Sequence, residues 1–403
     1  MKASFTPSLA RGSVVAPPSK SMGHRALFAA ALGEGESFVS PIAPSEDMRA
    51  TISALSALGA TFSPEGEGVR VTGMGFPRRV ERVVNCRESG STLRFVLPLC
   101  LLTGEEMLLT GAPRLLARPL SVYEALCREK GFLFQRTEEG ILVCGKLAPG
   151  EYAVPGNISS QFITGLLFAL SLLPRESLLR VTGEMESAPY VDMTLSAMAD
   201  FGVLVRKEGQ DFNISGSARY RSREYTVEGD YSNAAFPDAF NLLGGSVSLL
   251  GLREDSLQGD AVYREIYPRL QQGYGTFDLS QCPDLAPILF ALAAALHGGE
   301  FTGTARLREK ESDRGAAMKA ELEKCGVHLT LEANCVLVPG GCLKAPVSPI
   351  CGHNDHRIVM AMSVLLSRLG GEIHGAEAVT KSYPNFFETI RKLGIEVKTD
   401  ETE

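Results

Sequence analysis

The sequence lacks the cysteine spacings and the long apolar runs that mark metal-bound, disulfide-bonded or membrane proteins. None of its nine cysteines forms a Cys-x-x-Cys pair, and the odd, scattered set argues against a disulfide framework or a zinc site. We interpret them as buried, reduced thiols of a cytoplasmic protein. The longest apolar runs, such as residues 285–296, are too short to span a bilayer and predict buried helices. The N-terminal residues lack the apolar core of a signal peptide.

Positive charge is the scarcer sign, with 40 Lys and Arg against 47 Asp and Glu and a formal net charge of −7. This balance argues against a general nucleic-acid surface and against an anionic-membrane surface. A local basic pocket is compatible with it and would stand out against an acidic exterior. A hydrophobic content of 44%, a charged content of 22% and a length of 403 residues are typical of a globular protein with two domains.

The chain contains an internal repeat, in which a helix end is followed by glycine and then by an apolar extended segment. The glycines of this repeat are Gly59, Gly131, Gly202, Gly326 and Gly394, and residues 270–277 form a related segment. Successive members lie roughly 70 residues apart, with one shorter step, so about six units fill the chain. A second series, a small polar loop entering an apolar helix, alternates with the first at residues 19–32, 90–102, 159–173, 232–243, 283–296 and 354–366.

These two series predict an α/β or α+β fold with short strands. Each repeat glycine stands where a helix would end on a left-handed residue, and the alternation in residues 61–63 and 203–205 is typical of strands. The loop–helix segments are apolar on nearly all sides, which predicts helices inside each domain and sheets outside. We expect one domain over residues 19–228 and a second over 229–403, completed by residues 1–18.

Charges at the loop–helix junctions indicate an anion-binding site. Lys20 stands at a helix entrance, where the helix dipole makes a cation unfavourable for stability. With backbone N–H groups, hydroxyls and Arg25 about one turn further on, it would form an anion receptor. From this motif alone, a solvated Lys with a snorkelling Arg is about equally well supported. Residues 88–94 repeat the pattern with an Arg, whereas the hydroxyl cluster at 157–161 is more simply read as an N-cap.

The C-terminal half carries charges at equivalent junctions, in residues 310–314, 354–357 and 381–384. Taken singly, these could be a helix start with local ion pairs, a capped helix and an exposed turn, and Asp284 could be an N-cap. Their shared position in the repeat favours a common site, because equivalent loops meet at one end of each domain. Two such ends facing each other would form a cleft for a ligand with several negative charges, with carboxylates able to move protons.

The junction motifs resemble the enolpyruvyl transferases over essentially the full length, and most closely the EPSP synthase (3-phosphoshikimate 1-carboxyvinyltransferase) family. The motifs are Pro18-Ser19-Lys20-Ser21 with Arg25, Ser89-Gly90-Ser91-Thr92 with Arg94, Arg118-Pro119, Ser159-Ser160-Gln161, Ser187-Ala188-Pro189-Tyr190, Lys310-Glu311-Ser312-Asp313-Arg314, Asp355-His356-Arg357 and Lys381. The resemblance implies a two-domain inside-out α/β barrel, with three βαβαββ repeats in each domain and a cleft that closes on its ligands. It further implies a monomer that acts on small molecules without a metal or an organic cofactor.

The resemblance also implies two sets of substrate-binding residues and a few proton-transfer groups. Shikimate 3-phosphate would bind Lys20, Ser21, Arg25, Ser159, Ser160, Gln161, Ser187, Tyr190, Asp284 and Lys310. Phosphoenolpyruvate would bind Lys20, Gly90, Arg118, Gln161, Arg314, Arg357 and Lys381. The enolpyruvyl group would pass to the 5-hydroxyl of shikimate 3-phosphate by addition and elimination, with Asp284 as the expected base and Lys20 and Glu311 sharing the other acid–base roles.

Two other functions are compatible with such a site. The enolpyruvyl transferase of UDP-N-acetylglucosamine shares the fold but carries a loop Cys, which residues 111–119 lack. A non-catalytic anion sensor on the same scaffold would need cations, but it would not need the carboxylates of Asp284 and Glu311.

The sequence departs from the resembled pattern at four positions. Glu88 and Arg306 stand where relatives carry Asn, Phe95 where Pro is common, and His24 where Asn is frequent. Glu88 beside an anion-binding pocket is expected to weaken phosphoenolpyruvate binding unless it pairs with Arg94 or Arg87.

Overall fold

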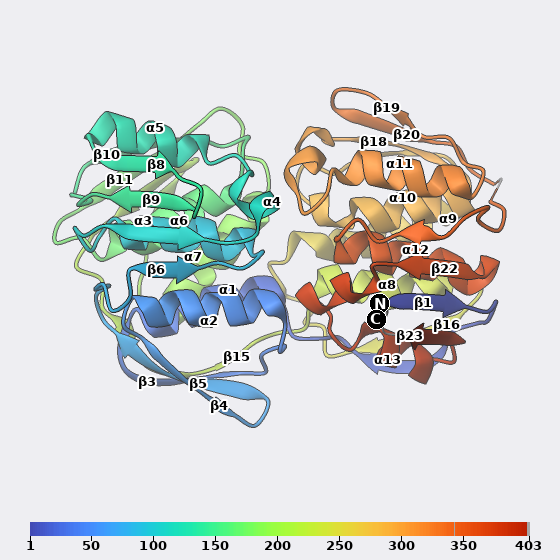
Figure 1. The fold of residues 1–403 in the computed structure, drawn as a ribbon, viewed down its shortest axis with the longest axis horizontal. Helices are drawn as coiled ribbons and strands as arrows, with labels where there is room; N and C mark the ends of the chain where they lie inside the picture. Colours follow the sequence, from blue (N-terminus) through green and yellow to red (C-terminus); the bar gives the residue numbers. More distant parts are fainter. Residues whose placement is uncertain (342, 401–403) are drawn as a thin grey trace. The chain divides into compact units, whose positions relative to one another are not determined.

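The computed structural model describes residues 1–341 and 343–400, and the chain divides into two compact units (Figure 1). The N-terminal unit comprises residues 20–227, and the C-terminal unit comprises residues 1–19 and 228–403. The first strands belong to the C-terminal unit because of their pairing. Strand β1 (Lys2–Phe5) lies antiparallel to β22 (Gly371–His374) and β23 (Val397–Asp400). Strand β2 (Arg11–Val15) lies parallel to β16 (Ser246–Leu250).

Three sheets form the outside of the N-terminal unit, and each combines a parallel pair with an antiparallel hairpin. In the second sheet, for example, β6 is parallel to β7, and β7 pairs antiparallel with the hairpin of β9 and β8. The strands are β3 (Gly33–Ser40), β4 (Thr61–Glu65), β5 (Gly68–Met74), β14 (Tyr220–Arg221) and β15 (Glu224–Thr226); β6 (Val83–Asn85), β7 (Met107–Thr110), β8 (Leu133–Arg136) and β9 (Ile141–Cys144); β10 (Glu151–Pro155), β11 (Ser177–Thr182), β12 (Arg206–Glu208) and β13 (Asp211–Ile214).

The helices of this unit fall into an inner and an outer set. The inner helices are α1 (Lys20–Ala31), α3 (Gly90–Cys100) and α6 (Ser160–Ser171), and nearly all of their residues are buried. The outer helices α2 (Glu46–Ala57), α5 (Ser121–Lys130) and α7 (Ala188–Asp200) bury one face each, and α4 (Pro113–Leu116) is a single turn. Interior helices with sheets outside are therefore observed, as the apolar helices predict.

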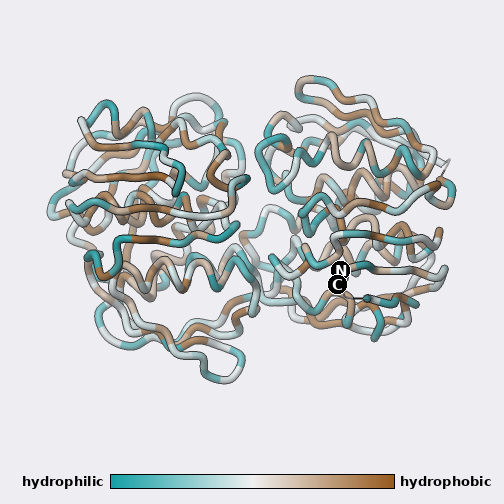
Figure 2. Tube along the Cα trace, viewed as in Figure 1, coloured by the Kyte–Doolittle hydropathy of each residue, from teal (hydrophilic) through white to brown (hydrophobic). Residues whose placement is uncertain are grey.

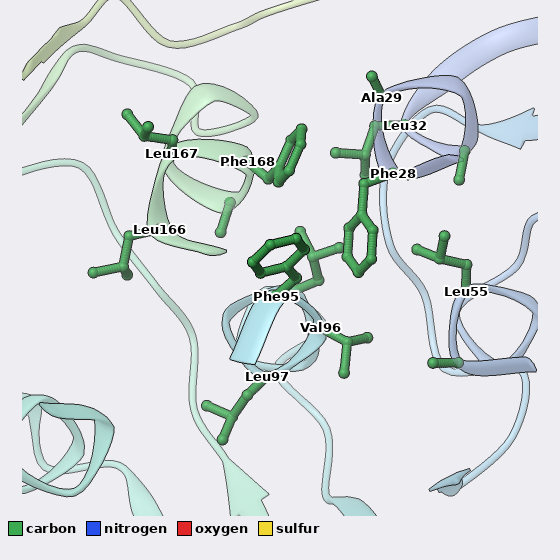
Figure 3. Packing of buried hydrophobic residues seen from close by; sticks show 14 of the residues in the cluster. Phe28, Ala29, Leu32, Leu55, Phe95, Val96, Leu97, Leu166, Leu167 and Phe168 are labelled. Atoms are coloured by element: carbon green, nitrogen blue, oxygen red, sulfur yellow. The ribbon is translucent and has the colours of Figure 1, made fainter. Parts of the chain in front are cut away.

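One aromatic residue from each inner helix meets at the centre of the N-terminal unit (Figure 3). The ring of Phe28 in α1 lies 5.4 Å from that of Phe95 in α3 and 5.5 Å from that of Phe168 in α6. Phe95, one of the departures from the resembled pattern, is thus a core residue. Its side chain packs the three inner helices together.

The C-terminal unit has the same arrangement of inner and outer elements. Its inner helices are α8 (Tyr231–Leu242), α10 (Ala286–Ala295) and α12 (His356–Leu369), and its outer helices are α9 (Tyr263–Gln272), α11 (Arg314–Lys324) and α13 (Phe386–Lys392). Besides the strands given above, it contains β17 (Thr276–Asp278), β18 (Gly299–Thr302), β19 (Thr330–Leu331), β20 (Cys335–Val338) and β21 (Ile350–Cys351). Figure 2 shows how hydrophobic and hydrophilic stretches alternate along the trace of each unit.

One repeat of the C-terminal unit is shorter than the others. Helix α9 ends at Gln272, and β17 begins at Thr276 as the first strand of the next sheet. No hairpin separates the two elements in this described stretch, so the sheet of β16 and β2 has only two strands there. The missing hairpin explains the shorter step between the repeat at residues 270–277 and the repeat around Gly326.

The repeat glycines have the predicted conformation. Gly59, Gly131, Gly202, Gly326 and Gly394 all have positive φ, between 71° and 115°. The strand expected at residues 203–205 is wrong, because β12 begins only at Arg206. The N–H of Val203 instead bonds to the carbonyl of Met198 at 2.8 Å, which closes the end of α7.

The expectation of buried, reduced thiols is only partly confirmed. The eight described cysteines are free thiols, and five of them are buried, whereas Cys144 and Cys335 are partly exposed and Cys351 is exposed. Cys342 lies outside the described residues. Within residues 1–341 and 343–400, no helix is both long enough and apolar enough to cross a membrane.

Gly165 tests how closely the inner helices pack. A Cβ at this position of α6 would lie 2.4 Å from the carbonyl oxygen of Arg94 in α3 and 2.6 Å from the hydroxyl of Tyr123. In an open helix Gly→Ala stabilises by up to ~1 kcal/mol. Here we expect Gly165→Ala to destabilise by roughly 1–3 kcal/mol, because the backbone of α3 must move. Urea unfolding checks this, with Gly150→Ala, whose methyl meets nothing within 4 Å, as the control. A stabilised Gly165→Ala protein would contradict the packing.

Candidate active site

Lys20 is the first residue of α1, and its ammonium is paired. Its Nζ lies 2.8 Å from Oδ2 of Asp47 in the first turn of α2, and the two side chains are only 13% and 11% exposed. The interpretation of Lys20 as a solvated surface residue is therefore wrong. Asp47 was missed in the sequence because only tertiary structure brings the two helix starts together.

Arg25 joins α1 to α7. Its Nε donates to Oγ1 of Thr194, its Nη1 to the carbonyl of Ser21 and its Nη2 to the carbonyl of Tyr190, at 2.7–2.8 Å. Burial lowers the pKa of its guanidinium to about 10, so the group stays charged at neutral pH. Arg25 is thus a fixed, buried cation that holds Ser21 and Tyr190, two of the predicted shikimate 3-phosphate ligands.

Gln161 connects the first turns of α3 and α6. Its amide oxygen accepts from Nη1 of Arg94 at 2.7 Å, and its Nε2 donates to Oγ of Ser91 at 2.9 Å. Arg94 also donates to the carbonyl of Pro119, next to Arg118. Arg94 therefore orients Gln161 and the segment that carries Arg118.

Gly90 and Arg118 are in close contact. A Cβ at Gly90 would lie 2.6 Å from Nη1 of Arg118, so only glycine leaves room for the guanidinium at this distance. Nε of Arg118 is buried and has no hydrogen-bond partner among the described residues. A cation held against the backbone at the start of a helix is suited to an anionic ligand.

Three predicted serines lie at the starts of α6 and α7. Ser159 caps α6 by accepting from the N–H of Gln161 at 3.3 Å, as the N-cap interpretation predicts. Ser160 follows it, and Ser187 precedes α7 with φ of +56°. Ser160 and Ser187 are both buried. Cations, hydroxyls and helix N-termini thus gather in one region of the N-terminal unit.

In the C-terminal unit, Arg314 is surrounded by carboxylates. Its Nε donates to Asp355 at 3.0 Å, its Nη1 to Asp284 at 2.8 Å and its Nη2 to Glu311 at 2.6 Å. Burial alone would lower the pKa of Arg314, but Asp355, Glu311 and Asp284 raise it above the ordinary value. The side chain is 1% exposed, so this cation is fully desolvated and fully compensated.

Asp284 is the meeting point of three cations. Oδ1 lies 2.8 Å from Nη1 of Arg314 and 3.2 Å from Nζ of Lys310, and Oδ2 lies 2.8 Å from Nη2 of Arg357. Burial alone would raise the pKa of Asp284, but Arg357, Lys310 and Arg314 hold it well below its usual value. The N-cap interpretation is wrong, because α10 begins at Ala286 with no side-chain cap.

Lys381 and Asp355 complete this cluster. Lys381 is buried and donates to the carbonyl of Asn354 at 2.6 Å, so the exposed-turn interpretation is wrong. Asp355 caps α12 through the N–H of Arg357 and also accepts from Ser312, both at 3.0 Å. The capped-helix interpretation is confirmed, and the cap itself belongs to the charge cluster. No group of His, Cys, Asp and Glu suited to a metal is found among residues 1–341 and 343–400.

Both arginines expected as partners of Glu88 donate hydrogen bonds to other residues. Arg87 donates to Glu46 at 2.6 Å, and Arg94 donates to Gln161 at 2.7 Å. Arg306 lies in the 3₁₀ turn of residues 305–309, just before Lys310.

The sequence matches the family described as EPSP synthase (3-phosphoshikimate 1-carboxyvinyltransferase) over residues 6–390. The chain belongs to the EPSP synthase family. A relative from Clostridium kluyveri named 3-phosphoshikimate 1-carboxyvinyltransferase is 39% identical over 418 residues, which cover 98% of this chain and 97% of the relative. A relative of the same name from Clostridioides difficile is 37% identical, with 96% of both chains covered.

Solved structures agree with this EPSP synthase assignment at the level of the fold. Two structures of EPSP synthase from Acinetobacter baumannii match with TM-scores of 0.77 and 0.78, at 23% and 22% identity. They cover 99% and 100% of this chain, and all of their own chains are covered. The two-domain α/β architecture is thus that of EPSP synthases.

The charge cluster of the C-terminal unit predicts a distinct pH dependence of stability. Asp284→Asn removes the carboxylate that Lys310, Arg314 and Arg357 share, so we expect a loss of about 3–5 kcal/mol in the free energy of unfolding at pH 7. The depressed pKa stabilises the fold above the unfolded pKa of Asp, about 3.9, and this contribution fades as the pH falls below it. In urea unfolding, the free energy of unfolding of Asp284→Asn should therefore lie below that of wild type by a constant amount down to about pH 4. At lower pH this difference should become smaller.

The control for this experiment is Asp255→Asn, which removes an exposed ion pair with Arg253 in the same unit. That change should have a much smaller effect, because solvent screens exposed pairs. A difference between Asp284→Asn and wild type that widens in acid would contradict the assignment of Asp284 as an ionised carboxylate.

Proposed function

We propose that the chain transfers the enolpyruvyl group of phosphoenolpyruvate to the 5-hydroxyl of shikimate 3-phosphate and releases phosphate, as a transferase of the shikimate pathway. Membership of the EPSP synthase family over residues 6–390 carries this proposal. The largely buried cations and carboxylates at or near helix starts, among them Lys20, Asp284 and Glu311, support it. The absence of Cys from residues 111–119 counts against transfer to UDP-N-acetylglucosamine.

Shikimate 3-phosphate would be held by directional hydrogen bonds to hydroxyls and by fixed cations. We assign it Lys20, Ser21, Arg25, Ser159, Ser160, Gln161, Ser187 and Tyr190 in the N-terminal unit, and Asp284 and Lys310 in the C-terminal unit. The three bonds of Arg25 to protein suit it to preorganising Ser21 and Tyr190 and to supplying positive potential nearby.

Phosphoenolpyruvate would be held by arginines and lysines that match its carboxylate and phosphate. We assign it Lys20, Gly90, Arg118 and Gln161 in the N-terminal unit, and Arg314, Arg357 and Lys381 in the C-terminal unit. Arg118 is ready to bind, since its Nε has no partner within the described residues. Arg314 and Arg357 contact Asp284 here, so an arriving anion would compete with that carboxylate for them.

This competition for Arg314 and Arg357 affects how strong a base Asp284 is. In the addition, the 5-hydroxyl oxygen forms a bond to C2 of phosphoenolpyruvate, its proton passes to Asp284, and C3 receives a proton from Lys20 or Glu311. In the elimination the roles reverse: the tetrahedral intermediate returns a proton from C3 to Lys20 or Glu311, the C2–C3 double bond re-forms, and the C2–O bond to phosphate breaks as phosphate takes up the proton from Asp284. With three cations holding its pKa low, Asp284 is a poor base. Ligand anions that draw Arg314 and Arg357 away would raise that pKa, which links base strength to substrate binding.

We also propose that the chain acts in the cytoplasm as a monomer, on small molecules and without binding nucleic acid. The net charge of −7 supports the last point. The monomer rests on the resemblance, and light scattering should then give a mass near 43.3 kDa.

The direct test is a phosphate-release assay. We expect release that requires both shikimate 3-phosphate and phosphoenolpyruvate and proceeds after treatment with a metal chelator. UDP-N-acetylglucosamine in place of shikimate 3-phosphate should support no release. Release with that acceptor, or tight anion binding without any turnover, would favour the sister transferase or the anion sensor instead.

Gly90→Ala tests the phosphoenolpyruvate assignment. The added methyl collides with the flexible tip of Arg118, so the fold should tolerate it while the guanidinium moves. Overpacking of this size costs roughly 1–3 kcal/mol, which corresponds to about one to two decades in affinity for phosphoenolpyruvate. A longer competitor such as glyphosate should lose more, and the KM for shikimate 3-phosphate should hardly change.

Steady-state kinetics with glyphosate and the Tm together test whether Gly90 contacts phosphoenolpyruvate. An unchanged ratio of inhibition constant to KM for phosphoenolpyruvate would remove Gly90 from the site. Gly150→Ala, which adds a methyl to open space in the same unit, should change neither quantity.

A further inference from the structure

A chain of buried hydrogen bonds runs from α1 through α2 to the start of α3. Nδ1 of His24 lies 2.7 Å from Oγ1 of Thr51, which lies 2.7 Å from Oγ1 of Thr92. The Thr92 hydroxyl donates to Oγ of Ser89 at 2.8 Å. Ser89 is the N-cap of α3, and its Oγ also accepts from the N–H of Thr92 at 3.2 Å. All four side chains are at most 1% exposed.

The direction of each bond follows from proton counting. The single hydroxyl proton of Thr92 is used on Ser89, so Thr51 must donate to Thr92. The Thr51 oxygen must then accept, and Nδ1 of His24 must carry the proton. The chain therefore fixes His24 as the neutral tautomer protonated at Nδ1. Nε2, the other ring nitrogen, is buried and has no hydrogen-bond partner in the described part of the chain.

The surroundings of His24 favour the neutral ring. Its edge meets the ring of Phe95, with centroids 6.4 Å apart. Burial, with Lys20 and Arg25 as nearby cations, lowers the pKa of His24 well below 6.5. A proton on Nε2 would place a third positive charge beside these two in a dry, apolar setting. His24 is thus a permanent donor rather than a titrating switch.

We propose that His24 is a positioning residue for phosphoenolpyruvate, acting through Thr51 and Thr92 on the Ser89 cap. The inference rests on the proposed function, which places the ligand against Lys20 and Gly90. Lys20 is the first residue of α1 and Gly90 the first of α3. The chain of hydroxyls ties these two helix starts together through α2, where Asp47 already holds Lys20. A break in the chain would let Gly90 and Arg118 shift relative to Lys20.

The first test observes the tautomer itself, without substrate. In protein labelled with 15N at histidine, the signals lost in His24→Asn belong to His24. We expect a neutral ring protonated at Nδ1 that does not titrate between about pH 8 and pH 5.5. A neutral ring protonated at Nε2 would overturn the inference because the chain of donors would then run the other way. Ordinary titration near 6.5 would overturn it because His24 would then not be held as one neutral tautomer.

The second test breaks the chain with a near-isosteric change. Thr51→Val removes the middle hydroxyl, and we expect the KM for phosphoenolpyruvate to rise about three- to tenfold relative to the KM for shikimate 3-phosphate, the scale of one hydrogen bond. Thr51→Ser keeps the hydroxyl and should restore the wild-type ratio. Thr92→Val breaks the chain one bond nearer the cap, so it should shift the ratio too and replaces Thr51→Val if that variant does not fold.

Ser171→Ala is the matched control. Its hydroxyl is equally buried in the same unit, where it bonds to Phe168 and Tyr220 at the other end of α6. It should lower the Tm without changing the KM ratio. If Thr51→Val and Thr92→Val also lower the Tm without changing the KM ratio, the four residues of the chain have only a structural role and the inference fails. Wild-type protein without turnover would overturn the proposed function itself, a result distinct from an active wild type with an unchanged ratio in the variants.

Discussion

The inner helices of both units are buried around nearly their whole circumference, and the positions of most candidate site residues depend on this. A helix such as α10 has no flank that could carry a charge into water, because all residues from Ala286 to Ala294 are buried. Most of the proposed ligand-binding groups therefore lie at or near the N-terminal ends of helices. The N-terminal end has backbone N–H groups without intrahelical partners and the positive end of the dipole. The architecture therefore favours an anion-binding region at these ends, in which the side chains would determine the anion bound.

The two units use this constraint in different ways. In the N-terminal unit, the three hydrogen bonds of Arg25 go to neutral oxygens, so its positive charge remains available to a ligand nearby. In the C-terminal unit, the charge of Arg314 is compensated by three carboxylates. A compensated cluster is stable without ligand but must exchange partners to bind one. The first unit is thus suited to recognition, and the second can couple binding to a change in the strength of its carboxylates.

The sequence reveals the repeat, the interior helices and the junction charges because each depends on local periodicity or on a single helix end. It does not reveal Asp47 beside Lys20, Thr194 beside Arg25 or the bonds of Asp284, since these contacts join residues distant in sequence. The wrong N-cap interpretation of Asp284 has the same origin: the local pattern fits a cap, while tertiary cations bind the carboxylate. The reaction is predicted only by the resemblance of the junction motifs to a known family, because a repeat specifies an architecture and not a substrate.

The serine caps show how one helix end can serve stability and binding together. Ser89 occupies the N–H of the third residue of α3, Thr92, and thereby fixes the start of the helix. The N–H groups of the two residues before it, Gly90 and Ser91, have no partner within the helix and lie at its positive end. Gly90 adds no side chain that would cover them, and Arg118 lies against it. A capping side chain one residue further along would accept from a different backbone N–H. The position of Ser89 therefore determines which N–H groups remain free of a side-chain cap and could bind a ligand.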